Sequence, residues 1–348
     1  MRIYDSKLWI SELDEVLDRF PGIRDLAGKS VLITGATGLI CSAAADLLIR
    51  CNDTQGTGIR ILAAGRSAEK VLARFGARDD VTFVPYDATR PDGPLPDSCD
   101  YIIHGASNAT PKTIMQEPVE TMLSNFVGLR RLLEHARTHG TARVLYVSSS
   151  EVYGKKDDAL PYREGQYGYI DLLNPRNSYP VSKRAAETLC ASYAAEYGVD
   201  TAIVRPGHIY GPTATPNDYR VSSAWAYAAA RGEDIVMKSD GAQLRSYCHC
   251  LDCASALLTV LLKGASTGAY NISNPASIIT IRQMAELLTR AGGVRLKLEL
   301  PAEEERKAFN PMSNSSLNSD ALEALGWQGL FGAERGFAET VRILRETM

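Results

Sequence analysis

Residues 31–41 read Val-Leu-Ile-Thr-Gly-Ala-Thr-Gly-Leu-Ile-Cys, and this stretch decides the fold. The short apolar run 31–33 predicts a buried parallel strand, and a helical pattern that continues to Arg50 follows the turn. Gly35 permits a tight turn, and Gly38 lets the backbone approach a phosphate group. A strand, a glycine turn and a helix in this order are typical of a site that binds a dinucleotide pyrophosphate at a helix N-terminus.

Two residues depart from the common form of this dinucleotide pattern. Cys41 stands where a third glycine usually serves close packing of helix and strand, so the motif is weakened, although a small cysteine can be accommodated. Arg66 follows the second predicted strand, 61–64, where an acidic residue usually binds the ribose of NAD. Arg66 either meets the 2′-phosphate of NADP or is an ordinary loop arginine, and the sequence favours neither.

Further apolar runs alternate with helical patterns along the chain. They lie at 61–64, 81–84, 101–103, 144–147 and 201–204. This alternation predicts an α/β fold with a Rossmann-type, doubly wound parallel sheet. After Gly207 the prolines and glycines interrupt the pattern, which indicates a smaller C-terminal substrate-binding lobe.

We therefore expect three parts in the chain. Residues 1–28 form an N-terminal helical extension docked outside the main sheet, and residues 29–207 form the Rossmann domain that carries the catalytic residues. Residues 208–348 form mainly the substrate-binding lobe, with segments near 234–263 returning to the Rossmann domain.

Composition and charge exclude several classes of protein. The net charge of -3 gives no indication of a nucleic-acid or membrane partner. No apolar run approaches the length of about 18 residues that a membrane span needs, and the first residues do not resemble a signal peptide, so we expect a cytoplasmic protein. Cys248, Cys250, Cys253 and His249 resemble a metal cluster, but they lie where a strand is expected to enter a helix. Cysteine there behaves as a small apolar residue, so we expect no metal.

A tyrosine and a lysine four residues apart, Tyr179 and Lys183, lie in a predicted helix over 178–196. About one helical turn separates them, so both side chains point the same way. We expect the lysine ammonium to lower the pKa of the phenol toward neutrality, so that Tyr179 can act as a general base. Ser149 follows the strand 144–147 at its carboxyl end, where open α/β sheets bind ligands. We therefore expect the Ser149 hydroxyl, the Tyr179 phenol and the Lys183 ammonium to lie together at one site.

Taken together, these motifs resemble those of the extended short-chain dehydrogenase/reductases, in the NAD-dependent nucleotide-sugar epimerase/dehydratase family. The resemblance covers roughly residues 29–330. It rests on Gly35-x-x-Gly38, Asp87, His104-x-Ala106-Ser107, Asn125, Ser149, Tyr179-x-x-x-Lys183, Arg205-Pro206, Tyr210-Gly211-Pro212 and Leu325-Gly326-Trp327.

Within the family, the residues after the fifth strand distinguish the reactions. The 4,6-dehydratases carry Thr-Asp-Glu before Val-Tyr-Gly, and the UDP-glucuronate decarboxylases (UDP-xylose synthases) carry Thr-Ser-Glu. The run Ser149-Ser150-Glu151 is similar to the decarboxylase pattern, as are the stretches 169–176 and 217–221. A serine hydroxyl is a far weaker acid than the aspartate of the dehydratases, which argues against elimination of water.

Three positions depart from the family pattern. His208 stands where an asparagine usually lies near the sugar diphosphate, and Thr213 stands where an arginine often follows Gly-Pro. The stretch 315–318 occupies the region in which an arginine often precedes Leu-Gly-Trp. Each of these changes is expected to alter how the protein binds a nucleotide diphosphate.

The resemblance implies three groups of site residues and no metal. The catalytic group is Ser149, Ser150, Glu151, Tyr179 and Lys183. The cofactor-binding group is Gly35, Thr37, Gly38, Leu39, Ile40, Arg66, Asp87, Ala88, Ala106, Ser107, Asn125, Tyr179, Lys183 and Pro206. The substrate-binding group is Ser107, Glu151, His208, Arg220, Val221 and Arg245. The cofactor is NAD, or NADP if Arg66 reads the 2′-phosphate, and helices over 111–139 and 178–196 suggest a homodimer.

The implied reaction is oxidation of a sugar hydroxyl, at C4, by bound nicotinamide. Decarboxylation, elimination or epimerisation follows, and the hydride returns to the sugar. A UDP-glucuronate decarboxylase is the first expectation, and a dTDP-glucose 4,6-dehydratase is an alternative. Arg66 motivates a second alternative, an NADPH-dependent reductase. Its substrate would be a keto sugar linked to a nucleotide, for example to CDP. A non-catalytic nucleotide-binding protein is a further alternative, against which the intact Ser149, Tyr179 and Lys183 argue.

Overall fold

Seven parallel strands form the main sheet of the computed structural model, which describes residues 2–156, 158–299 and 313–348. The strands are β1 (Ser30–Thr34), β2 (Arg60–Gly65), β3 (Val81–Pro85), β4 (Tyr101–His104), β5 (Arg143–Val147), β6 (Thr201–Pro206) and β10 (Ala269–Ile272). Their order is β10-β6-β5-β4-β1-β2-β3. The order reverses where β1 lies beside β4, and ligands bind at the carboxyl side of such a switch point.

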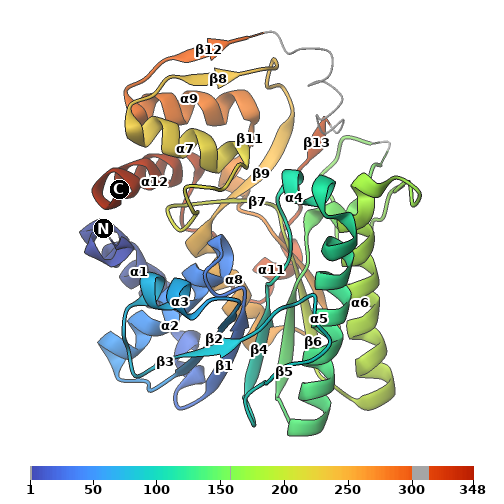
Figure 1. Ribbon diagram of the computed structural model, residues 1–348. Coiled ribbons are helices and arrows are strands. Elements are labelled where there is room, and N and C mark those ends of the chain that lie inside the picture. Colours follow the sequence, from blue (N-terminus) through green and yellow to red (C-terminus); the bar gives the residue numbers. More distant parts are fainter. Residues whose placement is uncertain (1, 157, 300–312) are drawn as a thin grey trace.

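Helices cover both faces of this sheet (Figure 1). On one face lie α2 (Leu39–Gln55), α3 (Ala68–Phe75) and α8 (Cys250–Lys263), and on the other α5 (Pro118–His139) and α6 (Ser178–Tyr197). Side chains of successive strand residues alternate between the faces, so Val31 and Ile33 join one core cluster and Leu32 joins the other. The predicted α/β fold with a doubly wound parallel sheet is confirmed.

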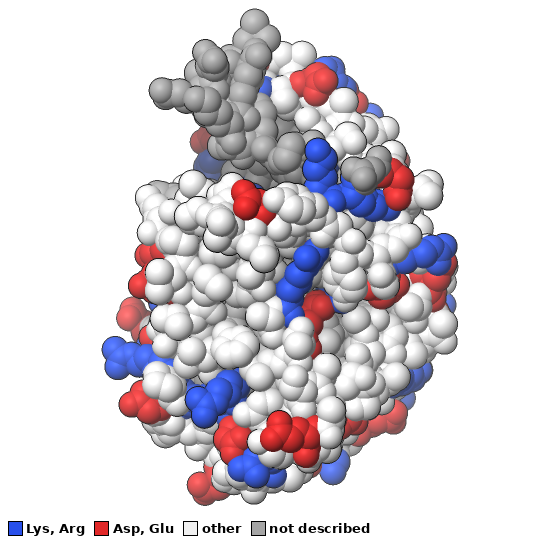
Figure 2. Space-filling view, turned by 90° about the vertical axis from the view of Figure 1, so that its right-hand side faces the viewer, with Lys and Arg blue, Asp and Glu red and all other residues white. Residues whose placement is uncertain are grey.

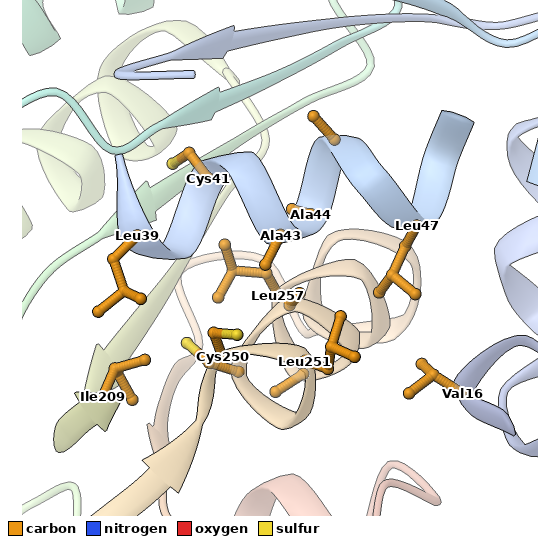
Figure 3. Packing of buried hydrophobic residues seen from close by; sticks show 14 of the residues in the cluster. Val16, Leu39, Cys41, Ala43, Ala44, Leu47, Ile209, Cys250, Leu251 and Leu257 are labelled. Atoms are coloured by element: carbon orange, nitrogen blue, oxygen red, sulfur yellow. The ribbon is translucent and has the colours of Figure 1, made fainter. Parts of the chain in front are cut away.

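The N-terminal residues pack on the outside of the α2–α8 layer. After the 3₁₀ turn η1 (Ile3–Asp5), helix α1 (Lys7–Arg19) begins where the Ser6 hydroxyl accepts the Trp9 N–H, and η2 (Pro21–Leu26) leads to β1. In Figure 3, Ala43 of α2 lies near Leu257 of α8, and Val16 of α1 lies on the side of Leu47 and Leu251. A small residue at 43 brings the two helices close, and each fully buried leucine contributes about 1.5–3 kcal/mol.

The smaller lobe lies above the carboxyl edge of the main sheet in Figure 1. Its strands are β7 (His208–Tyr210), β8 (Ile235–Met237), β9 (Leu244–His249), β11 (Ile278–Thr280), β12 (Leu296–Leu298) and β13 (Asn314–Ser315). Its helices are α7 (Val221–Arg231), α9 (Ile281–Gly292) and α12 (Ala333–Thr347), while the short α11 (Asp320–Glu323) contacts β10. Strand β9 pairs with β7, β11 and β13, and β8 pairs with β12.

The return of the chain to the Rossmann domain differs from the expected range 234–263. The first part of that range is wrong, because β8 and β9 pair only with lobe strands. The chain crosses back at Cys250, where α8 begins and packs against α2, and β10 then supplies the seventh strand of the main sheet. Among the described residues, no helix is both long enough and apolar enough to span a bilayer.

Candidate active site

The glycine turn after β1 forms a cradle at the N-terminus of α2. Gly35 has a φ of 68°, and a Cβ atom at this position would lie 3.0 Å from the Ala106 backbone nitrogen. Gly38 is the N-cap residue, and it offers no side chain to the amides of the first helical turn, which includes Leu39 and Ile40. These N–H groups remain for an anionic ligand, so the turn fits a dinucleotide pyrophosphate.

The loop after β4 is fixed beside this turn by a polar contact. The Thr34 hydroxyl lies 2.7 Å from His104 Nδ1 and accepts the Ala106 N–H at 3.2 Å. Burial, with the charge of Lys183 added, lowers the pKa of His104 to about 3, so the imidazole is neutral. The Ser107 hydroxyl is buried and has no hydrogen-bond partner in the described part of the chain. It is therefore free to bond a ligand at this edge.

Arg66 and Asp87 lie at the carboxyl ends of β2 and β3. The Asp87 carboxylate accepts the N–H and the hydroxyl of Thr89, at 2.9 and 2.8 Å. Burial opposes its ionisation, but these bonds and the charges of Arg66 and Arg90 hold the pKa of Asp87 below its usual value. The neighbouring Ala88 is buried. The exposed Arg66 is thus close enough to Asp87 for its charge to act on this end of the cleft.

The structure brings Tyr179 and Lys183 together on one buried face of α6. Lys183 Nζ donates to the Val147 carbonyl at 2.7 Å and lies 5.6 Å from the centroid of the Tyr179 ring. The same nitrogen lies 4.7 Å from the centroid of the Tyr146 ring. Burial lowers the pKa of Lys183 to about 7, and the carboxylate of Glu187 partly offsets this effect.

The pKa of Tyr179 does not follow the expectation. Burial, followed by the negative charge of Glu151, raises it above the ordinary value, and the Ser149 hydroxyl and the Arg220 charge only partly offset this. The direction of this shift is therefore opposite to the one predicted from the spacing of Tyr179 and Lys183. The main reason is the burial of the phenol itself, while the Lys183 ammonium donates to the Val147 carbonyl.

The predicted catalytic residues Ser149, Ser150 and Glu151 lie in the short helix η3 (Ser150–Tyr153) and at its start. Ser149 is the N-cap residue, and its hydroxyl accepts the Glu151 N–H at 3.2 Å. Ser150 is the first residue of η3. The Glu151 side chain is 40% exposed and lies 3.8 Å from the guanidinium of Arg176. Desolvation within the cleft raises the pKa of Glu151, and the Arg176 charge partly offsets it.

Arg176 is a residue of this site that the sequence did not predict. It lies in η4 (Pro175–Asn177), directly before α6, and its guanidinium is one-third exposed. Its position three residues before Tyr179 was a usable signal, because η4 contacts α6, the helix that carries Tyr179.

A buried network under the site was also missed. Glu187 accepts the Ser148 hydroxyl at 2.6 Å and two donors of Arg205, Nε at 2.9 Å and Nη2 at 2.6 Å. These contacts join α6 to the ends of β5 and β6, of which Pro206 is the last residue. Asn125 of α5 donates to Ser182 of α6 at 3.0 Å, and this bond joins the two helices. The spacing of Tyr179, Lys183 and Glu187, four residues each, puts all three on one helix face and could have predicted the network.

The lobe brings further predicted site residues near Tyr179. His208 pairs in strand register with Tyr247, and their rings lie 5.8 Å apart. Burial and the charges of Arg245 and Arg220 lower the pKa of His208 to about 3, so its imidazole is neutral. The charge of Arg220 acts on both His208 and Tyr179, so the three residues lie near one another.

The remaining predicted substrate residues also belong to the lobe. Arg220 is bound to the buried Asp218, with Nε donating at 2.9 Å, and Val221 begins α7 with its side chain exposed. Arg245 is buried in β9 and donates to the Leu244 carbonyl at 2.9 Å.

The positions that depart from the family pattern have separate roles. The Thr213 hydroxyl donates to the Leu39 carbonyl at 2.8 Å, so this residue joins the lobe to the start of α2. Asn314 and Ser315 form β13 and pair with Leu244 and Arg245 of β9. All seven cysteines are buried, and the described residues assemble no group of three or more metal-ligating side chains.

Comparison with known proteins agrees with this geometry. The model of the NAD dependent epimerase/dehydratase family matches residues 31–273. UDP-glucuronic acid decarboxylase 3 of Arabidopsis thaliana is 30% identical over 86% of this chain and 84% of its own, and UDP-glucuronic acid decarboxylase 1 of Xenopus tropicalis is 27% identical over 95% and 76%. The structure of DesIV, a dTDP-glucose 4,6-dehydratase of Streptomyces venezuelae with NAD and TYD bound, aligns with a TM-score of 0.77 at 23% identity, over 91% of this chain and 97% of that chain.

The family match covers well over half of the chain, and it includes the glycine cradle, Ser149, Tyr179 and Lys183. The chain therefore belongs to the NAD dependent epimerase/dehydratase family, as an extended short-chain dehydrogenase/reductase that modifies nucleotide sugars.

Proposed function

We propose that this protein decarboxylates a nucleotide-linked uronic acid, with UDP-glucuronate as the first substrate to test. The run Ser149-Ser150-Glu151 beside Tyr179 carries the proposal, because a serine replaces the acid that elimination of water needs. Glu151 lies near enough to Tyr179 for its charge to act on the phenol, which supports a shared reaction centre. Relatives named UDP-glucuronic acid decarboxylase, at 27% and 30% identity, also support it.

The residues of the chain have separate tasks in this reaction. Tyr179, in its ionised form, accepts the proton of the C4 hydroxyl, Ser149 hydrogen-bonds the reacting oxygen, and Lys183 holds the ribose of the cofactor. A nicotinamide dinucleotide bound at the glycine cradle would supply the oxidising power for C4 and return the hydride at the end of the reaction. The C4 ketone makes the C6 carboxylate part of a β-keto acid. The C5–C6 bond then breaks, carbon dioxide leaves, and C5 gains a proton.

Mass spectrometry of the product tests the proposal. The enzyme with NAD and UDP-glucuronate should give a UDP-pentose and carbon dioxide, and Tyr179→Phe should give neither. Lack of conversion of UDP-glucuronate, together with turnover of a keto sugar that consumes NADPH, would favour the reductase. Loss of water from dTDP-glucose would favour the dehydratase. Natural function that survives in Tyr179→Phe would favour a non-catalytic role.

NAD is the cofactor that we propose for this site. The glycine cradle and Asp87 support dinucleotide binding, and neighbouring structures such as that of DesIV contain NAD. The exposed Arg66 keeps NADP open as the alternative. Calorimetry with both dinucleotides tests this assignment, and binding of neither would contradict it.

A homodimer through α5 and α6 is also part of the proposal. Large apolar side chains are exposed along α4 (Pro111–Gln116) and the first half of α5; they are Met115, Val119, Met122, Leu123 and Phe126. Figure 2 views the side of the molecule that carries α5 and α6, and much of its surface is uncharged. Such a face supports contact with a second copy. Sedimentation of Phe126→Glu tests it: the variant should be a monomer where the wild type is a dimer.

A further inference from the structure

We propose that Arg176 binds the carboxylate of the substrate sugar and so selects a uronic acid over a neutral hexose. This inference rests on the proposed function, since it assigns a residue to the substrate class of that reaction. The motifs of the sequence left Arg176 without a role.

The position of Arg176 is fixed, but its guanidinium is only loosely occupied. Its backbone N–H donates to Asn174 Oδ1 at 3.0 Å, and α6 begins two residues later. The guanidinium lies 3.8 Å from a carboxylate oxygen of Glu151, beyond the usual range of a charge-assisted hydrogen bond. With a side chain that is 33% exposed, Arg176 can exchange this partner for a ligand.

Other arginines around the site are bound more firmly. Arg205 makes short bonds to Glu187, and Arg220 is held by Asp218. The guanidinium of Arg184 donates to three backbone carbonyls, those of Val152, Tyr153 and Gly168. These side chains support the walls of the cleft, whereas the guanidinium of Arg176 faces Glu151 across an open contact.

Substrate chemistry brings a carboxylate to the same place. If Tyr179 meets the C4 hydroxyl, the C6 substituent lies only two bonds further along the sugar, beside Glu151 and Arg176. Glu151 alone would repel a carboxylate there. The planar guanidinium of Arg176 offsets that repulsion and matches a carboxylate with two parallel hydrogen bonds. A hexose has an uncharged hydroxymethyl group at C6 and gains nothing comparable.

Glu151 and the substrate carboxylate then compete for one guanidinium. Removing the charge of Glu151 should therefore tighten binding of a uronate and leave binding of a hexose unchanged. If Arg176 and Glu151 only supported the fold, replacing Glu151 would not tighten the binding of a uronate while replacing Arg176 weakened it.

Calorimetry tests the assignment with the full-length protein in the presence of NAD. All titrations use a Tyr179→Phe background, so that turnover does not consume the probe, and the probes are UDP-glucuronate and UDP-glucose. Arg176→Gln should weaken binding of UDP-glucuronate by about tenfold to a hundredfold and change binding of UDP-glucose less than about twofold. Glu151→Gln should tighten binding of UDP-glucuronate several-fold. Arg342→Gln, an exposed arginine of α12 with a 70% exposed side chain, is the matched control and should change neither.

Three outcomes would overturn the assignment. They are equal weakening for both probes in Arg176→Gln, no weakening for UDP-glucuronate, and no preference for UDP-glucuronate before Arg176 is changed. Failure of the proposed function gives a different result. A wild type that binds UDP-glucuronate through Arg176 but releases no carbon dioxide would contradict the decarboxylase and keep this assignment.

Discussion

The thiol of Cys41 fills the space in which a side chain at Gly105 would have to lie. A Cβ atom built on Gly105 would be 2.3 Å from Cys41 Sγ, far closer than any van der Waals contact. Cys41 replaces the third glycine of the dinucleotide motif, and Gly105, at the end of β4, supplies the missing room. Helix α2 can thus keep its close approach to the sheet with a larger residue at position 41.

This relationship predicts a rescue between two substitutions. Gly105→Ala should lower the free energy of unfolding by about 1–3 kcal/mol, because it overpacks the contact with Cys41. The double variant Cys41→Gly, Gly105→Ala should recover most of that loss, as measured by urea unfolding. Gly165→Ala, at an exposed position with open space around it, is the control and should change little. Equal losses in the single and double variants would contradict the pairing.

The Glu187–Arg205 pair predicts a large effect on stability. Both side chains are buried, with exposed fractions of 9% and 2%, so removal of one charge leaves the other without compensation. Glu187→Gln should lower the free energy of unfolding by about 3–5 kcal/mol. The exposed pair Glu134–Arg137 provides the control, and Glu134→Gln should be close to neutral in the same urea titration. The argument fails if the two variants lose the same stability.

Glu12 of α1 lies near Glu339 of α12, and this pair of carboxyl groups predicts that the stability of the protein depends on pH. Burial, and then the nearby Glu339, raises the pKa of Glu12 from 4.5 to about 9. Between these values the folded protein holds a proton that the unfolded chain releases, so the stability contributed by protonated Glu12 falls as the pH rises. Glu12→Gln mimics the protonated form and should flatten this dependence.

Thermal unfolding at about pH 6 and about pH 9 measures the difference. The wild type should lose on the order of 4 kcal/mol more than Glu12→Gln across this interval, since the interval lies between the two pKa values and each pH unit corresponds to about 1.4 kcal/mol. Glu286→Gln, at an exposed position of α9, is the control and should follow the wild type. If the wild type and Glu12→Gln lost the same free energy of unfolding between the two pH values, the result would contradict this account.

The sheet and the shared helix face of Tyr179 and Lys183 could be predicted because their signals are local. A buried parallel strand needs a short apolar run such as 31–33, and two residues four apart on a helix share a face, as Tyr179 and Lys183 do. Desolvation has no local signal. The sequence therefore led to a lowered pKa for Tyr179, whereas burial in the folded chain raises it and lowers the pKa of Lys183 to about 7.

The missed residues depend on contacts between distant parts of the chain. Gly105 compensates for Cys41 only because β4 lies beside β1, and Arg176 reaches Glu151 only because η4 contacts the cleft from an irregular segment. The strands β8 and β9 were assigned to the wrong domain for the same reason. Short runs at 235–237 and 244–249 look alike whether they join a large sheet or a small one.

The last prediction concerns the choice between NAD and NADP at Arg66. This arginine follows β2, at the strand end where the adenosine ribose binds in Rossmann folds, and its charge acts on Asp87. If Arg66 pairs with a 2′-phosphate, Arg66→Asp should repel NADP and accept the ribose hydroxyls of NAD. The ratio of the two dissociation constants should then shift toward NAD by at least about tenfold.

Arg90 provides the matched control for this charge reversal. It lies 3.9 Å from Asp87 with a 75% exposed side chain, but it follows β3 rather than β2. In calorimetry, Arg90→Asp should at most weaken the binding of NAD and NADP equally. The ratio of their two dissociation constants should stay unchanged. An unchanged ratio in Arg66→Asp as well would mean that Arg66 is an ordinary loop residue. NAD would then be favoured only by the absence of a group that reads the 2′-phosphate, and the motive for an NADPH-dependent reductase would disappear.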